Sequence, residues 1–599
     1  MSGLLLAAVL LWPLLLLAGQ VLRHTLWQGL AQGGRCPELL NWVWLSAPLP
    51  ALLLALWPGE LQLVMEGWLL GGIWQLEEVR RPWLTFSALL WLLATFYARG
   101  YFADERLAAA RGAGEARRRL YLFTLLWPLT FCGNMLLLLA EDIPSFYLGF
   151  AIMTFAAYAL VVHSSSSSAH HGGFVYLVMA LAGEGLILGG LLWSAGSTDG
   201  ITLTALRETI AEADQGFWMA GLLWLGFGVK AGVFGLHVWL PLAHPVAPTP
   251  ASAVLSGVMV KAGVIGWLST LPLGHVDAGL APLGQAITLM GLFGAFAAAL
   301  LGVAQRQPKA VLAYSSVSQL GMLASLVGMG LSSPAQWPAL LAALTLFAAH
   351  HGLTKGALFL GVGISEHPPR LPLWLVWLLL VLPALSLSGV LASGLVAKHG
   401  MKEALYAGGH SMLVTWLSLA AVGSTLLMSR ALWLQWRERG ARALTWRFSM
   451  PLAWLITVLA ALTLPWWLPL GESGTAWPPL QEFPALVWPA ALGLAIAGLV
   501  WGTSRQATYH KWLAGGWLRQ GDLWWAYAAL ARRVMIAMRA QGGRLGARAQ
   551  RVRQRLRGDE RRGMRKLDGV TRIEQFFIRF NAPLMVGLAL LLLLGLWLG

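Results

Sequence analysis

Long apolar segments recur along this 599-residue chain, and they constrain its fold more than any other feature. Each is about 20 residues long, enough to cross the hydrocarbon core of a bilayer as a helix. Hydrophobic residues make up 57% of the chain and charged residues only 11%, a balance foreign to soluble proteins of this length. The sequence therefore predicts an all-α polytopic membrane protein.

We predict about sixteen transmembrane helices and assign their orientation from the loop charges. Nearly all loop Lys and Arg residues follow odd-numbered spans, whereas only Arg80, Arg81, Arg207 and Lys402 follow even-numbered ones. The positive-inside rule then places the N-terminus outside and the basic loops in the cytoplasm, as in a multi-pass protein of a bacterial inner membrane. The apolar run from residue 4 to 17 lacks a basic flank, so we interpret it as the first span rather than a cleaved signal. The spans lie near residues 4–20, 38–57, 83–101, 120–139, 145–163, 174–194, 217–236, 251–271, 280–302, 311–331, 336–361, 372–396, 411–429, 451–470, 486–502 and 582–598.

The order of these spans indicates an internal repeat. Helices four to eight and nine to thirteen have a similar layout, as expected of two inverted five-helix repeats in a transporter. The loop before the third span, residues 59–82, alternates enough to form a short hairpin on the outer face. The predicted segments are N-terminal helices one to three (1–112), the first repeat (113–275), the second repeat (276–435), helices fourteen and fifteen (436–502), a basic surface helix (503–580) and a C-terminal transmembrane helix (581–599).

Residues 503–580 combine 18 Lys and Arg with apolar residues at roughly helical spacing, which is typical of an amphipathic helix on the cytoplasmic surface. Such a helix would form either a basic collar on anionic lipid or a strap along neighbouring subunits. The final span at its far end favours the strap. Since the excess of positive charge, +16 overall, follows the membrane face, it indicates lipid rather than nucleic acid as its partner.

Two apolar segments within residues 221–267 each contain one lysine near the middle, Lys230 and Lys261. A charge at that depth costs about 2.5–3.5 kcal/mol on insertion scales, so such residues are usually functional. Four glycines surround Lys230 and predict a broken seventh helix beside a cavity: Gly226, Gly228, Gly232 and Gly235. We expect the chain to move cations, with protons as the first choice.

Glu184 is the one acid that the sequence places in the centre of a span. Opposite charges about 4 Å apart attract by about 4 kcal/mol at an effective dielectric near 20, so Glu184 is expected to pair with Lys230. Approach or retreat of this acid would switch the lysine between its protonated and neutral forms. Lys261, one helix onward, would accept the next proton.

The eleventh span places His351 and Lys355 four residues apart, hence on one helical face, as a relay between Lys261 and Lys398. The alternative for His350 and His351 is simple packing polarity. Pro383, Gly389, Gly394 and Gly400 are expected to break helix twelve around Lys398. Near the outward end of that helix, three residues suit an exit: His399, Lys402 and Glu403.

Four segments together resemble the antiporter-like subunits of the complex I superfamily, which includes respiratory complex I, Mrp-type antiporters and membrane-bound hydrogenases. They are GVKAGVFGLHVWLPLAHPVAPTPASAVLSGVMVKAG, PKAVLAYSSVSQLGML, HHGLTKGALFL and ASGLVAKHGMKEAL, in the expected order. SGVMVKAG is most similar to hydrogenase-type and Mrp-type members, whereas the surface helix with its terminal span resembles the distal subunit of complex I. The resemblance implies that Lys230 and Lys261 are the lysines of helices seven and eight. It also implies that His351 and Lys355 connect them to Lys398 of helix twelve, with His237, His244 and His350 as secondary candidates.

One position departs from the family pattern. Members usually have a glutamate in helix five, but FYLGFAIMTFAAYALV places Ala151 there. Either Glu184 takes over as the partner of Lys230, or coupling is altered. Glu141 and Asp142 lie too near the outer interface to be the first choice.

The preferred function is a proton-translocating subunit of a multisubunit membrane complex, of complex I, hydrogenase or Mrp type. Alternatives are a Na⁺/H⁺ or K⁺/H⁺ antiporter subunit, a membrane coupling subunit of an inorganic-carbon uptake system, and a structural anchor with a vestigial path. The chain has no nucleotide fingerprint, and its two cysteines, Cys36 and Cys132, form no ligand motif. We therefore expect no cofactor, no metal and no redox centre in this chain. The segment 163–172, with three histidines, is expected to be a solvated loop rather than a metal site.

Overall fold

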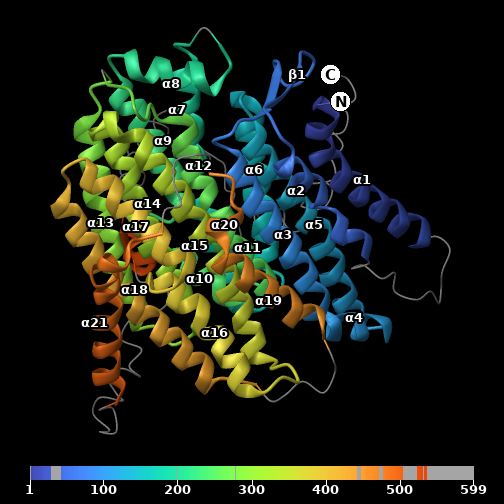
Figure 1. The fold of residues 1–599 in the computed structure, drawn as a ribbon. Coiled ribbons are helices and arrows are strands. Elements are labelled where there is room, and N and C mark those ends of the chain that lie inside the picture. Colours follow the sequence, from blue (N-terminus) through green and yellow to red (C-terminus); the bar gives the residue numbers. More distant parts are fainter. Residues whose placement is uncertain are drawn as a thin grey trace, which may run out of the picture.

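The fold is a bundle of packed helices (Figure 1), seen in a computed structural model that describes residues 2–28, 42–198, 200–276, 278–440, 447–470, 477–502, 523–530, 532, 533 and 535. Ten helices in these ranges are long and apolar enough to cross a membrane, and three shorter apolar helices accompany them. The all-α polytopic prediction is confirmed. The count of sixteen spans and the division into six segments stay predictions.

The N-terminal part consists of four helices and the expected hairpin. The two strands are antiparallel, with Leu61 opposite Leu76, and the indole N–H groups of Trp68 and Trp74 both donate to the Ser145 hydroxyl. The hairpin is therefore fixed to the start of α6 (Ile143–Val161). The elements are α1 (Ser2–Gln28), η1 (Trp42–Ser46), α2 (Leu49–Leu56), β1 (Leu61–Met65), β2 (Gly72–Leu76), α3 (Arg81–Tyr101) and α4 (Ala103–Ala110).

The next helices follow the order expected of two five-helix units, whose inverted relationship stays a prediction. The first unit comprises α5 (Gly114–Leu139), α6 (Ile143–Val161), α7 (Ser167–Ala195), α8 (Leu203–Glu212), α9 (Gly216–Ala231), α10 (Leu240–Val246), α11 (Thr249–Val254), the π-helix η2 (Leu255–Met259) and α12 (Lys261–Thr270). The second comprises α13 (Ala281–Val303), α14 (Pro308–Ser332), η3 (Pro334–Gln336), α15 (Trp337–Glu366), α16 (Leu373–Ser388), α17 (Ala392–Ala407) and α18 (Ser411–Arg437). After them come α19 (Ser449–Leu462), α20 (Leu464–Trp467), η5 (Leu480–Glu482) and α21 (Phe483–Gly502).

Two spans are interrupted where they were expected to be. In the seventh predicted span, α9 ends at Gly232, whose φ of +73° is the left-handed conformation that glycine adopts without strain. In the twelfth predicted span, α16 ends in the same way at Gly389, with φ +87°. The predicted breaks at Pro383, Gly394 and Gly400 are wrong, since Pro383 lies inside α16 and both glycines lie inside α17. A single left-handed residue is enough to end a helix.

Two further differences from the sequence-based expectation concern local structure. Span eight contains the π-helix Leu255–Met259, which was not predicted. The solvated loop expected at 163–172 is shorter than predicted, because Ser166 accepts from the Ala169 N–H and caps α7. His170 and His171 are therefore helical.

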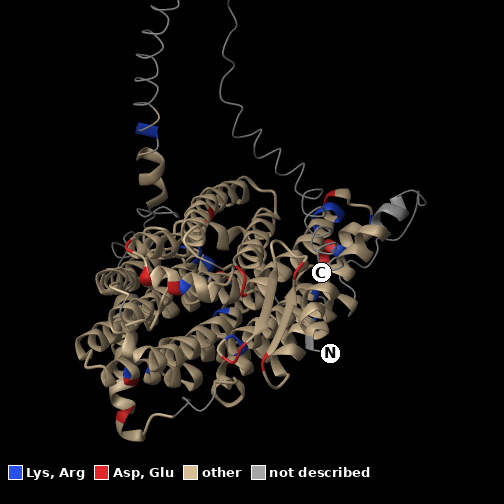
Figure 2. Cartoon of the chain, turned by 90° about the horizontal axis from the view of Figure 1, so that it is seen from above, with Lys and Arg blue, Asp and Glu red and all other residues tan. Residues whose placement is uncertain are grey.

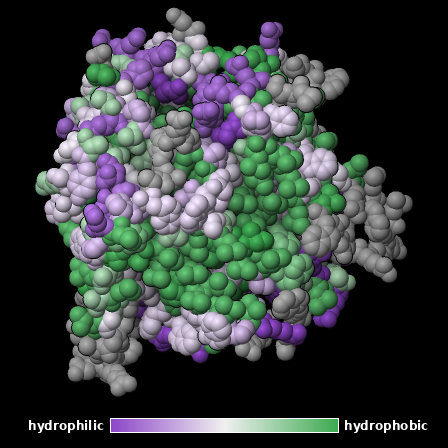
Figure 3. Space-filling model, in the orientation of Figure 1, coloured by the Kyte–Doolittle hydropathy of each residue, from purple (hydrophilic) through white to green (hydrophobic). Residues whose placement is uncertain are grey.

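The surface has the distribution of a membrane protein. In Figure 3 hydrophobic residues form a broad zone across the middle of the visible face, with hydrophilic residues above and below it. The view from above in Figure 2 shows that some of the described charged residues lie among the packed helices. These interior charges lead to the site.

Most of the predicted surface helix and the last predicted span lie outside the described residues. Helical residues 523–530 are described, and they pack against the first unit. Trp525 stacks on His171 with ring centroids 6.1 Å apart, and the Tyr527 hydroxyl donates to the carbonyl of Gly235 in the break of helix seven. This short piece therefore contacts both α7 and the broken segment.

Candidate functional site

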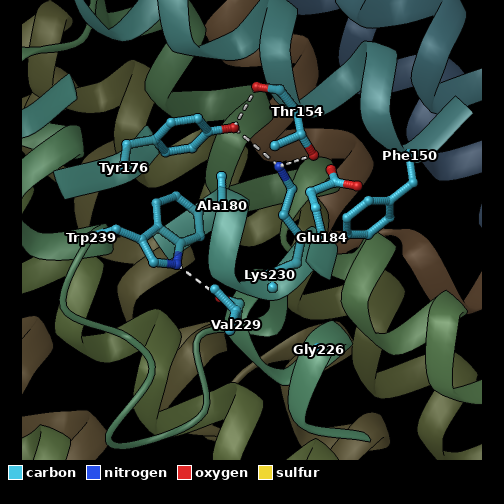
Figure 4. Close-up of a pocket in the computed structure, with 10 residues that line it drawn as sticks. Phe150, Thr154, Tyr176, Ala180, Glu184, Gly226, Val229, Lys230 and Trp239 are labelled. Carbon is cyan, nitrogen blue, oxygen red and sulfur yellow. Dashed lines mark hydrogen bonds between the residues drawn. The ribbon is translucent and has the colours of Figure 1, made fainter. Parts of the chain in front are cut away.

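Lys230 lies in the last turn of α9, with only 5% of its surface exposed. Its Nζ donates at 3.2 Å to the Thr154 hydroxyl on α6 and at 3.2 Å to the Tyr176 hydroxyl on α7 (Figure 4). The Tyr176 O–H itself donates to the Thr154 carbonyl at 2.9 Å. The ammonium is thus held by neutral oxygens from two neighbouring helices.

Aromatic rings complete the surroundings of this ammonium. Nζ lies 5.4 Å from the ring centroid of Tyr176, 5.8 Å from that of Phe150 and 5.9 Å from that of Trp239. The Trp239 indole is fixed by donating to the Val229 carbonyl at 2.8 Å. Ring faces attract cations, by about 2 kcal/mol or more where water is excluded. The rings therefore stabilise a charge that has left water.

Glu184, on α7, lines the same cavity as Lys230 but forms no ion pair with it. Its carboxylate is buried, and neither oxygen has a hydrogen bond of normal geometry within the described residues, although the hydroxyls of Thr154 and Tyr147 lie close enough to interact with it. It still acts electrostatically on Lys230. The cavity leaves about 10 Å³ open to the centre of a water molecule, about the minimum that holds one water. A bridging water fits better than the direct contact expected from the sequence.

The structure also accounts for the departure at Ala151. Thr154, which holds Lys230, lies three residues further along α6 and so on the same side of the helix. α7 and α9 approach each other closely beside it. The measure of this approach is that a Cβ added to Gly226 would lie only 3.0 Å from the Gly183 carbonyl oxygen. A hydroxyl therefore contacts the ammonium on the helix where the resemblance led us to expect a carboxylate. Sequence analysis missed Thr154 and Tyr176, although the spacing from Ala151 could have indicated the first.

Lys261 begins α12 directly after the π-helix and is 1% exposed. Its Nζ donates to the Ser256 carbonyl at 2.7 Å, inside the π-helix. The Ser256 hydroxyl bonds in turn to the Ser316 hydroxyl of α14 at 2.7 Å. Single π-turns within α-helices are frequent at functional sites, and here the irregular turn supplies the lysine's acceptor.

His351 and Lys355 are both fully buried on α15, as a relay would need. The Lys355 Nζ donates to the Leu312 carbonyl at 2.6 Å and to the Ser315 hydroxyl. Both ring nitrogens of His351 are without a hydrogen-bond partner in the described part of the chain. His351 lies close enough to Lys261 and Lys355 to act on both electrostatically. The structure thus brings these three groups together.

Lys398, on α17, is tied to the break in helix twelve. Its Nζ donates at 2.9 Å to the carbonyl of Ser388, the last residue of α16. His350 acts electrostatically on Lys398 and Lys261, and its Nδ1 shares a hydrogen bond of 2.9 Å with the Ser393 hydroxyl. His350 therefore connects the break with the centre of the molecule.

The remaining secondary candidates divide between two places. The Nδ1 of His399 lies 3.1 Å from a carboxylate oxygen of Glu482, and the Lys402 Nζ donates to the Ala485 carbonyl. Ligand atoms of His399, Glu403 and Glu482 lie within 4.8 Å of one another, so Glu482 joins a group that the sequence only partly identified. His237 accepts from the Gly235 N–H at 3.2 Å within the break of helix seven.

The predicted residues thus form two clusters. The first cluster is Glu184 with Lys230, and the central cluster is Lys261, His350, His351, Lys355 and Lys398. Among the described residues, Lys230 and Lys261 share no hydrogen-bond partner: Lys230 donates to Thr154 and Tyr176, whereas Lys261 donates to Ser256. Proton transfer between the clusters would need water or a movement.

Comparison with known proteins agrees with this architecture. The model of the transmembrane family "NADH:quinone oxidoreductase/Mrp antiporter" matches residues 140–388. Hydrogenase-4 component B of Escherichia coli (strain K12) is 34% identical over 244 residues, which are 39% of this chain and 36% of that protein. A putative antiporter subunit of Staphylococcus saprophyticus is 29% identical over 356 residues, which are 54% of this chain and 42% of that protein. The alignments thus span less than half of either relative.

A chain in the structure of the Mrp complex from Dietzia sp. DQ12-45-1b has the same fold, with a TM-score of 0.67 at 20% identity. The match covers 98% of this chain and 68% of that one. The matched region 140–388 contains both clusters apart from Lys398. Residues 140–388 therefore match the transmembrane family "NADH:quinone oxidoreductase/Mrp antiporter", and the chain is similar to antiporter-like membrane subunits of the complex I, Mrp and hydrogenase superfamily.

Proposed function

We propose that this chain translocates protons within a multisubunit membrane complex. The path runs from Glu184 and Lys230 through Lys261 and the pair His351 and Lys355 to Lys398. One observation supports it above all: a buried ammonium and a buried carboxylate, Lys230 and Glu184, face one small cavity without forming an ion pair. A tight ion pair would hold the proton, whereas a separated pair can exchange it through one water.

The surroundings of Lys230 favour protons over Na⁺ or K⁺. A hard metal cation needs several oxygen ligands, but two of the oxygens that line the cavity, the hydroxyls of Thr154 and Tyr176, already accept from the Lys230 ammonium. An antiporter subunit that moves Na⁺ or K⁺ is the second candidate, because one relative is named as an antiporter subunit.

Partner subunits belong to this proposal. The structural neighbour is part of a multisubunit membrane complex, and we propose the same setting here, in a bacterial inner membrane with the N-terminus outside. The complex would supply the driving reaction. Lipid is expected around the apolar zone of Figure 3.

The test uses the complex purified with its native partners, reconstituted into vesicles and followed with a pH-sensitive dye. Lys230→Ala should abolish proton movement while the complex still assembles, and Glu184→Gln should impair it nearly as much. Arg430→Met is the matched control, since Arg430 is also a buried cation but bonds to the Gln305 carbonyl outside the path. Full pumping by Lys230→Ala would refute the proposal. Full pumping by Glu184→Gln alone would mean that another acid serves Lys230.

A further inference from the structure

His244 is a buried imidazole that the path described above does not use. It lies on α10, is fully buried, and both its ring nitrogens are without a hydrogen-bond partner within the described residues. Buried polar side chains nearly always have a partner, so such a group needs an explanation. A histidine that only filled space would be replaceable by an apolar ring at lower cost.

Its neighbours connect it to the central cluster. The imidazole stacks on the Phe359 ring, with centroids 4.5 Å apart and an interplanar angle of 23°. The Lys355 Nζ lies 5.8 Å from the centroid of the same ring. His244 and Lys355 thus share Phe359 as a neighbour and act on each other electrostatically.

Lys309, in the first turn of α14, is a second charged neighbour of His244. Lys309 is partly buried, and its Nζ donates at 2.9 Å to the carbonyl of Ala247, the residue after α10. It acts electrostatically on His244. Glu366, the exposed last residue of α15, acts in turn on Lys309. Exposure therefore falls step by step from Glu366 through Lys309 to His244.

The position of this series suits uptake from the cytoplasm. Glu366 and Lys309 lie at helix ends on the side of the basic loops, which the positive-inside rule assigns to the cytoplasm. Lys355 lies at the inner end of the series, at the centre of the molecule. The notable feature is an ordered run of titratable groups from surface to core.

We propose that Glu366, Lys309 and His244 form a second proton inlet, which feeds Lys355 directly from the basic-loop face. This rests on the proposed function, because it presupposes that Lys355 moves protons. In the first step the Lys309 ammonium gives one proton to the unprotonated ring nitrogen of neutral His244. In the second step His244 releases the proton on its other nitrogen to neutral Lys355. Lys309 then regains a proton from the cytoplasm beside the Glu366 carboxylate, and turning the ring restores the starting tautomer.

The two free nitrogens are what this scheme requires. An imidazole can accept on one nitrogen while it donates from the other. A hydrogen bond from either nitrogen to a fixed protein group would block one side of the transfer. Lys230 is absent from this route, so the inlet would reload Lys355, while the first cluster would still be needed to drive the proton onward to Lys398.

The decisive variant is His244→Phe in the assembled complex, reconstituted in vesicles and followed with a pH-sensitive dye. Phenylalanine retains a flat ring against Phe359 but has no nitrogen. Removing a positioned proton-transfer group typically costs about 100-fold or more in the step it serves, so we expect a loss of proton movement by at least about tenfold. The matched control is His163→Phe, since this buried imidazole also packs against two aromatic rings, Phe102 and Phe123, and lies outside the inlet.

Lys309→Met tests the same inlet if His244→Phe does not assemble. Steps in series are not additive, so the double variant should be no slower than the slower single variant. Additive losses, or normal pumping by His244→Phe, would overturn the inlet. If those variants pump normally while Lys230→Ala and Lys398→Ala do not, the inlet fails and the proposed function stands. If Lys230→Ala and Lys398→Ala also pump normally, the proposed function fails.

Discussion

Replacing Thr154 by valine tests whether Lys230 depends on neutral oxygens for its charge. Valine has the shape of threonine without the hydroxyl, and Thr154 is 1% exposed, so the change removes one acceptor and leaves the packing nearly unaltered. The Tyr176 hydroxyl still donates to the backbone carbonyl at this position. The perturbation is therefore confined to this hydroxyl, which accepts the bond from Lys230 and also lies close to the Glu184 carboxylate.

The size of the effect follows from the type of bond. A hydrogen bond to a charged group contributes about 1.5–3 kcal/mol, and each 1.4 kcal/mol is a factor of ten in an equilibrium. The protonated form of Lys230 keeps the Tyr176 hydroxyl at 3.2 Å and the nearby rings, so it is weakened rather than lost. We expect binding of the proton at Lys230 to weaken by about ten- to a hundredfold.

The assay is the rate of proton movement in vesicles at several external pH values. Thr154→Val should be slow near neutral pH and should recover toward acidic pH, because a higher proton concentration refills the weakened site. Thr457→Val is the control, since Thr457 is also fully buried but its hydroxyl bonds only within its own helix, to the Ala453 carbonyl at 2.7 Å. An unchanged pH profile for Thr154→Val would refute the role given to this hydroxyl.

Two further variants test the helix break and a charged site outside the spans. Gly389→Ala should slow proton movement, because an added Cβ would lie 3.0 Å from the Lys398 Nζ and the left-handed backbone costs a residue with a Cβ about 1–2 kcal/mol; equal pumping by this variant and by Gly400→Ala, where nothing lies within 4 Å of the added Cβ, would contradict it. Burial raises the pKa of the Asp142 carboxyl above its usual value, so the folded state holds this proton more tightly than the unfolded chain and loses that stabilisation as the pH rises through the raised pKa. The thermal midpoint of the wild type should therefore fall relative to that of Asp142→Asn as the pH is raised from about 4 upward, and parallel midpoints would count against this.

Structural features that depend on the residues of a single segment could be predicted from the sequence. The membrane class follows from apolar length, and the deep lysines stand out because each interrupts such a segment. The break after Lys230 was visible as a cluster of glycines. These inferences need no knowledge of which helices are neighbours.

Contacts between helices could not be predicted in this way. Thr154 and Tyr176 lie in ordinary apolar helices, and only the packing of α6 and α7 against α9 brings their hydroxyls to Lys230. The π-helix before Lys261 has no compositional signal, since one extra residue in a turn leaves the apolar pattern nearly unchanged. Glu482 is remote in sequence from its partner His399 and joins it only through tertiary structure.

The four buried lysines differ in one respect that bears on how the path is driven. Lys261, Lys355 and Lys398 each donate to a backbone carbonyl, and two of those carbonyls belong to a π-helix or a helix break. A carbonyl cannot change its charge, so the protonation of these three amines depends on the charges of the other lysines and of the nearby histidines. Lys230 alone among the four has an acid in its cavity, and that acid acts on it electrostatically without a direct ion pair. A change in the distance between Glu184 and Lys230 would therefore alter the charge at the start of the path, and the like charges beyond would pass that change on by repulsion.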